Sequence, residues 1–114
     1  MSKIAVIVLS DTTTEEGLGR VYNALTAVKQ FSAGGDEVEL YFDGTGVRWI
    51  DVLIDPQHPI NGLYQSVADH IVAVCSDCAN FFGKKDNPKP FGDIAVGDVD
   101  YQKLTASGYQ IFNF

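Results

Sequence analysis

The feature that most constrains the fold is an apolar run near the start of the chain. Residues 4–9 read Ile-Ala-Val-Ile-Val-Leu, without a polar interruption and mostly β-branched. Such a run predicts a strand that is covered on both faces, as in a parallel sheet flanked by helices. It is too short and too β-branched for the core of a signal peptide, and no small-residue cleavage site follows it. We therefore expect a cytoplasmic protein whose cysteines are reduced at rest.

Helical patterns alternate with short apolar runs along the rest of the chain. Two capping-box pairs, Thr12 with Glu15 and Thr13 with Glu16, predict the start of a helix that ends at Gly34-Gly35. Further strands are expected at residues 38–42, 71–74, 94–96 and 109–114, and further helices at residues 47–53, 63–70 and 98–107. This alternation predicts a three-layer α/β/α sandwich with a mostly parallel sheet of about five strands.

Composition indicates the number of domains and excludes two classes of partner. The chain has 114 residues, of which 46% are hydrophobic and 20% charged, as expected for one globular domain over residues 1–114. Its net charge of −7 would repel nucleic-acid phosphates, and Lys84, Lys85 and Lys89 are too few to form a nucleic-acid footprint. No segment is long and apolar enough to span a bilayer. We expect neither nucleic-acid nor membrane binding.

Polar residues follow each of the first three predicted strands. The first strand is followed by Asp11-Thr12, the second by Asp43-Gly44 and the third by Cys75-Ser76. In open α/β sheets, ligands bind outside the carboxyl ends of the strands, which share one edge of a parallel sheet. These six residues are therefore the candidates for a ligand-binding site.

Cys75 is the candidate nucleophile. A cysteine that lies between a buried strand and a helical turn is close to unpaired backbone N–H groups, which favour the thiolate over the thiol. Lys84 and Lys85 would add to this effect, whereas Asp77 opposes it. Cys78 completes a C-x-x-C motif, so it could attack a disulfide or persulfide formed on Cys75. We expect Cys78 to be the accessory, resolving thiol.

The sequence leaves other interpretations of the cysteine pair open. Two small buried residues one helical turn apart would have the same spacing without any chemistry. A zinc site needs two more ligands, and only His58 and His70 are available, at no recognised finger spacing. A thioredoxin-type motif would open a long helix after the first strands, whereas this pair lies past the middle of the chain. We expect no cofactor and no resident metal.

Three further features also have more than one interpretation. The hydroxyl-rich loop 10–14 could cradle a phosphate, but its acidic neighbours favour ordinary helix capping. Gly44-Thr45-Gly46 has neither a full dinucleotide fingerprint nor a phosphate-loop lysine, so we interpret it as a turn. Trp49 and the pair Phe81-Phe82 belong either to the core or to a subunit interface.

Several segments together resemble the DsrE-like family (DsrE/DsrF-like proteins), small α/β proteins that include sulfur-relay subunits. The matching segments are Lys3–Val8, Asn23–Leu25, Phe42–Gly44, Val74–Gly83 and Gly108–Ile111. The resemblance covers essentially the full length of the chain. It implies the same α/β sandwich fold.

The resemblance also implies a function and partners. In the relay members, a cysteine at the end of a central strand accepts sulfane sulfur as a persulfide, and a glycine lies eight residues beyond it, as Cys75 and Gly83 do here. Sulfur donor and acceptor proteins, or small sulfane-sulfur species, would be the partners, and trimers or hexamers the assembly. The relay members often have basic residues just before that glycine, where this chain has Phe81-Phe82.

The leading hypothesis is therefore a sulfur-relay protein, a sulfurtransferase-type carrier with the persulfide on Cys75 and Cys78 as the resolving thiol. The second hypothesis is a non-catalytic module of the same fold. It would bind a small molecule or a partner near Asp11, Asp43 and Trp49, and its cysteines would be structural.

Overall fold

The computed structural model describes residues 1–82 and 96–114 of the chain. Gly83, Lys84 and Lys85, to which the sequence assigns supporting roles, lie outside these residues. In chain order, the elements are β1 (Lys3–Val8), α1 (Glu15–Ala33), β2 (Glu37–Phe42), the 3-10 helix η1 (Gly44–Arg48), α2 (Trp49–Leu53), α3 (Asn61–Val67), the 3-10 helix η2 (Ala68–His70), β3 (Ile71–Cys75), α4 (Ser76–Phe82), β4 (Val96–Gly97), α5 (Tyr101–Ala106) and β5 (Gln110–Asn113).

The strands form one sheet in the order β4-β3-β2-β1-β5, and every neighbouring pair is parallel. The expected α/β class with a parallel sheet is confirmed. Four of the strands have four to six residues, whereas β4 has two and pairs only with the end of β3. The sheet therefore has four strands of ordinary length, fewer than the expectation of about five, and β4 extends it only briefly at one edge.

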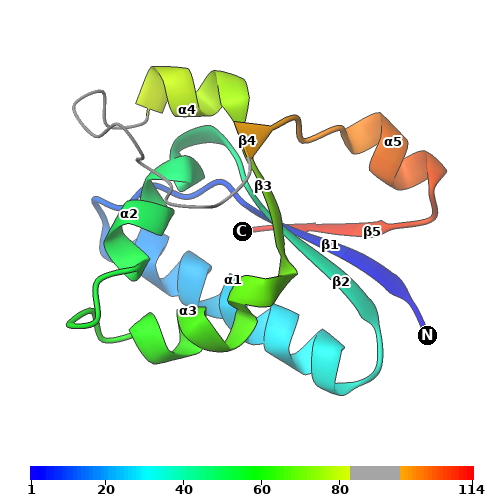
Figure 1. Ribbon diagram of the computed structural model, residues 1–114, viewed down its shortest axis with the longest axis horizontal. Coiled ribbons are helices and arrows are strands. Elements are labelled where there is room, and N and C mark those ends of the chain that lie inside the picture. The colour runs from blue at the N-terminus through cyan, green and yellow to red at the C-terminus, as the bar shows by residue number, and fades with distance from the viewer. Residues whose placement is uncertain (83–95) are drawn as a thin grey trace.

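Helices cover both faces of the sheet (Figure 1). The chain moves in one direction across the sheet from β1 to β4, and right-handed crossovers therefore place α1, α2 and α3 on the same face. It then returns across the whole sheet to β5, which places α5 on the opposite face. Each face has its own buried cluster, and the cluster under α1, α2 and α3 is the larger.

The apolar run at the start of the chain forms β1, an inner strand between β2 and β5, and it is covered on both faces as its sequence predicts. Five of the six residues of β1 are buried. Ile4, Val6 and Val8 pack into the larger cluster, and Ala5 and Ile7 into the smaller one. The parallel arrangement brings the carboxyl ends of the strands to one edge of the sheet, where the candidate site lies.

Helix α1 begins slightly later than either predicted capping box. Its N-cap is Thr14, whose side chain accepts a hydrogen bond from the backbone N–H of Gly17 at 2.9 Å. The backbone N–H and the hydroxyl of Thr12 both donate to the Asp11 carboxylate, so the loop holds Thr12 before the helix. The prediction that Thr12 or Thr13 caps the helix is wrong, but the hydroxyl-rich loop does serve in capping.

The glycines after β2 shape the turn at the site. Gly44 has a φ of +55°, a backbone conformation that suits glycine. A Cβ on Gly46 would lie 2.1 Å from the carbonyl oxygen of Val8, so only glycine lets this segment pack against the end of β1. The segment forms η1, which continues into α2, and the helix expected at residues 47–53 therefore starts earlier, with 3-10 geometry.

Helix α5 is shorter than the expected span of residues 98–107. Its N-cap is Asp100, whose side chain accepts a hydrogen bond from the backbone N–H of Lys103 at 3.0 Å. This cap makes Tyr101 the first residue of the helix, close to the carboxyl edge of the sheet. No helix in the described part of the chain combines the length and the hydropathy needed to cross a membrane.

Candidate functional site

Four side chains from three parts of the chain meet at the carboxyl edge of the sheet. Asp43 follows β2 directly, Cys75 is the last residue of β3, Cys78 lies one turn into α4, and Tyr101 opens α5. The Asp43 carboxylate accepts a hydrogen bond from the Cys78 thiol at 3.1 Å and another from the Tyr101 hydroxyl at 2.6 Å. Its carboxylate therefore links β2, α4 and α5.

The packing of α4 explains why the two thiols and the carboxylate converge. Strands β2 and β3 are neighbours in the sheet, so Asp43 and Cys75 leave it side by side. Helix α4 then packs against η1, and Cys78 packs against the larger core cluster. One ligand atom from each of Asp43, Cys75 and Cys78 lies within 4.8 Å of the other two.

The surroundings of Asp43 keep it ionised. Burial opposes the charged form, but hydrogen bonds from Tyr101, Cys78 and the Gly44 amide outweigh it, and the pKa of Asp43 lies below its ordinary value. Asp43 is therefore a carboxylate at neutral pH and accepts from both its neighbours. The same contact, together with burial as the larger cause, raises the pKa of Tyr101 well above its ordinary value.

The surroundings of Cys78 keep it protonated. Burial, followed by its hydrogen bonds with Asp43 and Cys75, raises the pKa of Cys78 to about 12. A thiol with so high a pKa is a hydrogen-bond donor at neutral pH and a poor nucleophile. The spacing of the C-x-x-C motif alone does not reveal that Cys78 is held as a thiol by its surroundings.

The other predicted ligand-binding residues divide between this cluster and a second one. The amide of Gly44 donates to Asp43 at 2.9 Å, and Ser76 is the first residue of α4, directly after Cys75. Asp11 forms an ion pair with Arg48, with N–O distances of 3.2 Å, and also accepts hydrogen bonds from Thr12. Asp11 is not part of the group of Asp43, Cys75 and Cys78.

The cluster around Asp11 has its own electrostatics. The backbone hydrogen bond from Thr12 is the main cause that lowers the pKa of Asp11, and Arg48 lowers it further against the effect of burial. The sequence indicates acidic neighbours around this loop, and the structure adds the guanidinium of Arg48, which pairs with Asp11. Among the described residues, Asp11 contacts Arg48 in the segment after β2, whereas Asp43, Cys75 and Cys78 form a separate group.

Sequence reasoning missed Tyr101 and Arg48 as members of these clusters. Tyr101 is distant from Asp43 in sequence, and no local pattern links the two. Arg48 is the basic residue in the last turn of η1, which the sequence indicated only as part of a helix starting at residue 47.

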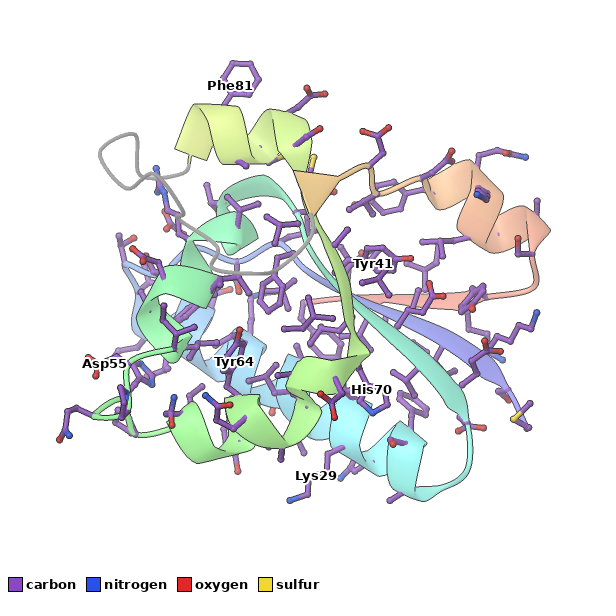
Figure 2. All side chains as sticks on the ribbon, viewed as in Figure 1. Lys29, Tyr41, Asp55, Tyr64, His70 and Phe81 are labelled. Atoms are coloured by element: carbon purple, nitrogen blue, oxygen red, sulfur yellow. The ribbon has the colours of Figure 1, made fainter. Side chains whose placement is uncertain are left out.

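The structure decides between core and interface for Trp49 and shows how exposed Phe81 is. Trp49 is 2% exposed, and its indole N–H donates to the carbonyl of Ser10 at 2.8 Å, so it is a core residue. A burial of this kind excludes Trp49 from an open ligand site or a subunit interface. Phe81 is 78% exposed, and Figure 2 shows its ring standing out from α4, away from the sheet.

Comparisons with known proteins support the fold and leave the activity undefined. No family model matches the chain. The crystal structure of the ychN protein from E. coli superposes over 100% of both chains with a TM-score of 0.69 and 18% sequence identity. The uncharacterized protein MJ0733 of Methanocaldococcus jannaschii is 29% identical over 92 residues, which cover 78% of this chain and 75% of that protein. The likeness to ychN shows the fold that this chain shares with it.

Proposed function

We propose that this protein is a DsrE-like sulfane-sulfur carrier of one domain that holds a persulfide on Cys75. The observation that carries the proposal is the asymmetry of the two thiols. Asp43 accepts a hydrogen bond from the Cys78 thiol, which therefore keeps its proton and is a poor nucleophile at neutral pH. Cys75, at the end of a central strand and only partly buried, is left as the thiol that reacts with a donor.

The resemblance and the fold agree with this role. The segments that resemble the DsrE-like family include the one that contains both cysteines. The fold shared with ychN over the whole chain is the α/β arrangement that the resemblance implies. Fold alone does not determine activity, so the proposal rests on the thiols and their neighbours.

The chemistry of loading and unloading balances with thiol–disulfide exchange alone. The Cys75 thiolate attacks the terminal sulfur of a donor persulfide, the donor S–S bond breaks, and the donor leaves as a thiolate. An acceptor thiolate later attacks the terminal sulfur on Cys75, takes it as a new persulfide, and releases the Cys75 thiolate. No net oxidant or reductant is consumed.

Cys78 has a separate part in this scheme. If its thiol attacks the inner sulfur of the Cys75 persulfide, a Cys75–Cys78 disulfide forms and hydrogen sulfide leaves. Asp43, which already accepts the hydrogen bond from Cys78 at 3.1 Å, is in position to take the proton as this attack occurs. The high pKa of Cys78 makes the attack slow, so the persulfide on Cys75 persists long enough to be transferred.

Intact mass spectrometry tests the proposal directly. The reduced, metal-free protein is incubated with a polysulfide or a thiosulfate donor, and its mass is measured before and after addition of dithiothreitol. We expect a reductant-sensitive gain of one sulfur atom that Cys75→Ser abolishes and Cys78→Ser prolongs. Wild-type protein with both thiols alkylated is the control, since the chain has two cysteines in all.

Two results would contradict the proposal. Equal loss of loading in Cys75→Ser and Cys78→Ser would remove the division of roles between the thiols. A loss of two hydrogens in the wild type, together with no sulfur gain in Cys78→Ser, where the internal disulfide cannot form, would indicate a redox dithiol instead.

A second candidate function is a binding module in which the cysteines are structural. Two observations favour it: the Cys78–Asp43 hydrogen bond is one that a structural thiol would make, and an open pocket of about 330 Å³ lies beside Asp11, Glu16 and Arg20. In this case no donor loads the protein, and Cys78→Ala lowers the free energy of unfolding by about 1–3 kcal/mol because Asp43 loses a partner. Urea unfolding of Cys78→Ala beside the mass assay distinguishes the two functions.

A further inference from the structure

The cluster of Asp43, Cys75 and Cys78 has the donor atoms of a metal site. One carboxylate oxygen and two sulfur atoms lie within 4.8 Å of one another, and Cys78 Sγ is 3.1 Å from Asp43 Oδ1. Thiolate sulfur and carboxylate oxygen are both ordinary ligands of Zn²⁺. The three residues come from the ends of neighbouring strands and from the first turn of α4, so the backbone fixes their relative positions.

The spacing agrees with tetrahedral coordination after small side-chain movements. With Zn–S bonds of about 2.3 Å and Zn–O bonds of about 2.0–2.2 Å, tetrahedral ligand atoms lie roughly 3.5–3.8 Å apart. Cys78 Sγ lies 3.1 Å from Asp43 Oδ1, and all three ligand atoms lie within 4.8 Å of one another, so no pair is more than about 1.3 Å from the tetrahedral spacing. The rotamer adjustments that close the site are therefore on the order of 1 Å.

We infer that Asp43, Cys75 and Cys78 bind a thiophilic divalent cation of the Zn²⁺ class. Three protein ligands leave the fourth position to a water molecule or to an incoming anion or thiol, which is the arrangement of open rather than purely structural zinc sites. The site goes beyond the sulfur-carrier function and does not depend on it. Both uses involve Cys75, so a bound cation and a persulfide exclude each other on the same chain.

Charge and hydrogen bonding around the cluster suit a cation. Asp43 accepts hydrogen bonds from the Tyr101 hydroxyl, the Cys78 thiol and the Gly44 amide, and the Cys75 thiol is a further hydrogen-bond partner, all of them uncharged donors. Two thiolates and one carboxylate would together carry three negative charges, which a divalent cation offsets. Tyr101 donates to Asp43 Oδ2 at 2.6 Å, while Oδ1 faces Cys78.

Tyr101 is therefore a positioning residue for the metal ligand Asp43. Hydrogen-bond partners of ligating carboxylates fix their orientation, and their removal typically weakens metal binding by about 10–100-fold. Oδ2 is bonded to Tyr101, and Oδ1 accepts from both the Gly44 amide and the Cys78 thiol. When the Cys78 proton leaves, Oδ1 keeps the Gly44 hydrogen bond and has a second lone pair with which to coordinate. The prediction for Tyr101→Phe is weaker binding with unchanged ligand type.

Cobalt(II) titration of the reduced, full-length protein under anaerobic conditions tests the site without any sulfur donor. Thiolate-to-cobalt charge transfer absorbs in the near ultraviolet, and the visible bands report tetrahedral geometry. The two cysteines of the chain are its sole source of thiolate, so the charge-transfer signal reports this site. Competition with Zn²⁺ then gives the Zn²⁺ affinity. Circular dichroism checks that each variant is folded.

We expect one cobalt ion per chain, with a thiolate band that Cys75→Ser and Cys78→Ser each reduce or abolish. Asp43→Asn should weaken binding about tenfold or more with the thiolate band still present at saturation. Tyr101→Phe should weaken it by a similar factor. Asp55→Asn, an exposed carboxylate in the loop between α2 and α3 that Figure 2 shows well away from α4, is the matched control and should bind as the wild type does.

Three outcomes would overturn the inference. The first is no thiolate band in the folded, reduced wild type. The second is equal affinity in Asp43→Asn and wild type, which would mean that the carboxylate is not a ligand. The third is one cobalt ion shared between two chains. Because sulfur loading is measured separately in metal-free buffer, failure of the metal site and failure of the carrier function are distinguishable, and Cys78→Ser should lose the first while retaining the second.

Discussion

Replacing Cys75 with Ser leaves Cys78 as the sole thiol of the chain and lets its protonation state be measured through its reactivity. Burial and the hydrogen bond to Asp43 raise the pKa of Cys78 from 9.0 to about 12. At pH 8 a rise of this size lowers the thiolate fraction roughly 1000-fold. A more basic thiolate is also a better nucleophile, which recovers about 20-fold, so the net reaction with a disulfide reagent should be roughly 50-fold slower.

The assay is the rate of reaction with 4,4′-dithiodipyridine, followed by absorbance, against a short unstructured cysteine peptide in the same buffer. We expect the rate of the Cys75→Ser protein to rise about tenfold per pH unit up to pH 10 without reaching a plateau, because the thiol stays mostly protonated. Adding Asp43→Asn should increase the rate at pH 8, since a hydrogen-bond acceptor with a negative charge is lost. A rate equal to that of the peptide, with a midpoint near pH 9, would refute the reasoning.

Further predictions concern stability and assembly. A Cβ on Gly17 would lie 2.0 Å from the Asp11 carbonyl oxygen, so Gly17→Ala should lower the free energy of unfolding by about 1–3 kcal/mol in urea titrations. A Cβ on Gly19, in the same helix, would have no atom within 4 Å, so Gly19→Ala should raise the free energy of unfolding by about 0.5–1 kcal/mol. Tyr101→Phe should cost about 1 kcal/mol at neutral pH. Because the folded pKa of Asp43 is lowered, this difference should shrink as pH falls below 3.8, and a constant difference in acid would contradict the assignment. The DsrE-like resemblance predicts trimers or hexamers, which analytical ultracentrifugation would show, and a monomer at micromolar concentration would refute it.

The sequence predicted the fold well wherever a residue pattern is compatible with only one degree of burial. The unbroken apolar run of β1 has no polar side chain to face water, so it is buried on both faces and must lie inside the sheet. The start of helix α1 was predicted less well, because several neighbouring hydroxyl side chains were possible N-caps. Thr12 donates to Asp11 and is thereby unavailable, which leaves Thr14 as the cap.

Only part of the candidate site could be predicted, because no local sequence pattern specifies the order of the strands in the sheet. The rule that ligands bind at the carboxyl ends of strands selected Asp43 and Cys75, and these meet because β2 and β3 are neighbours. Asp11 follows β1, and its loop turns instead to Arg48 on η1. Tyr101 reaches Asp43 because the chain returns from β4 past β3 and β2 to β5, a path that follows from the fold as a whole.

A single substitution, Asp43→Asn, separates the two uses proposed for the thiols. In sulfur carriage the Asp43 carboxylate is a negative charge beside the reacting sulfur, and it repels anionic donors such as polysulfide and thiosulfate. Its loss should therefore speed the loading of Cys75, as measured by the initial rate of mass gain in metal-free buffer. In metal binding the same carboxylate is a ligand, and its loss should weaken the site about tenfold or more. Asp55→Asn changes the net charge equally and should leave both properties unchanged. If Asp43→Asn lowered both sulfur loading and metal affinity in a folded protein, Asp43 would instead act by holding the whole cluster together.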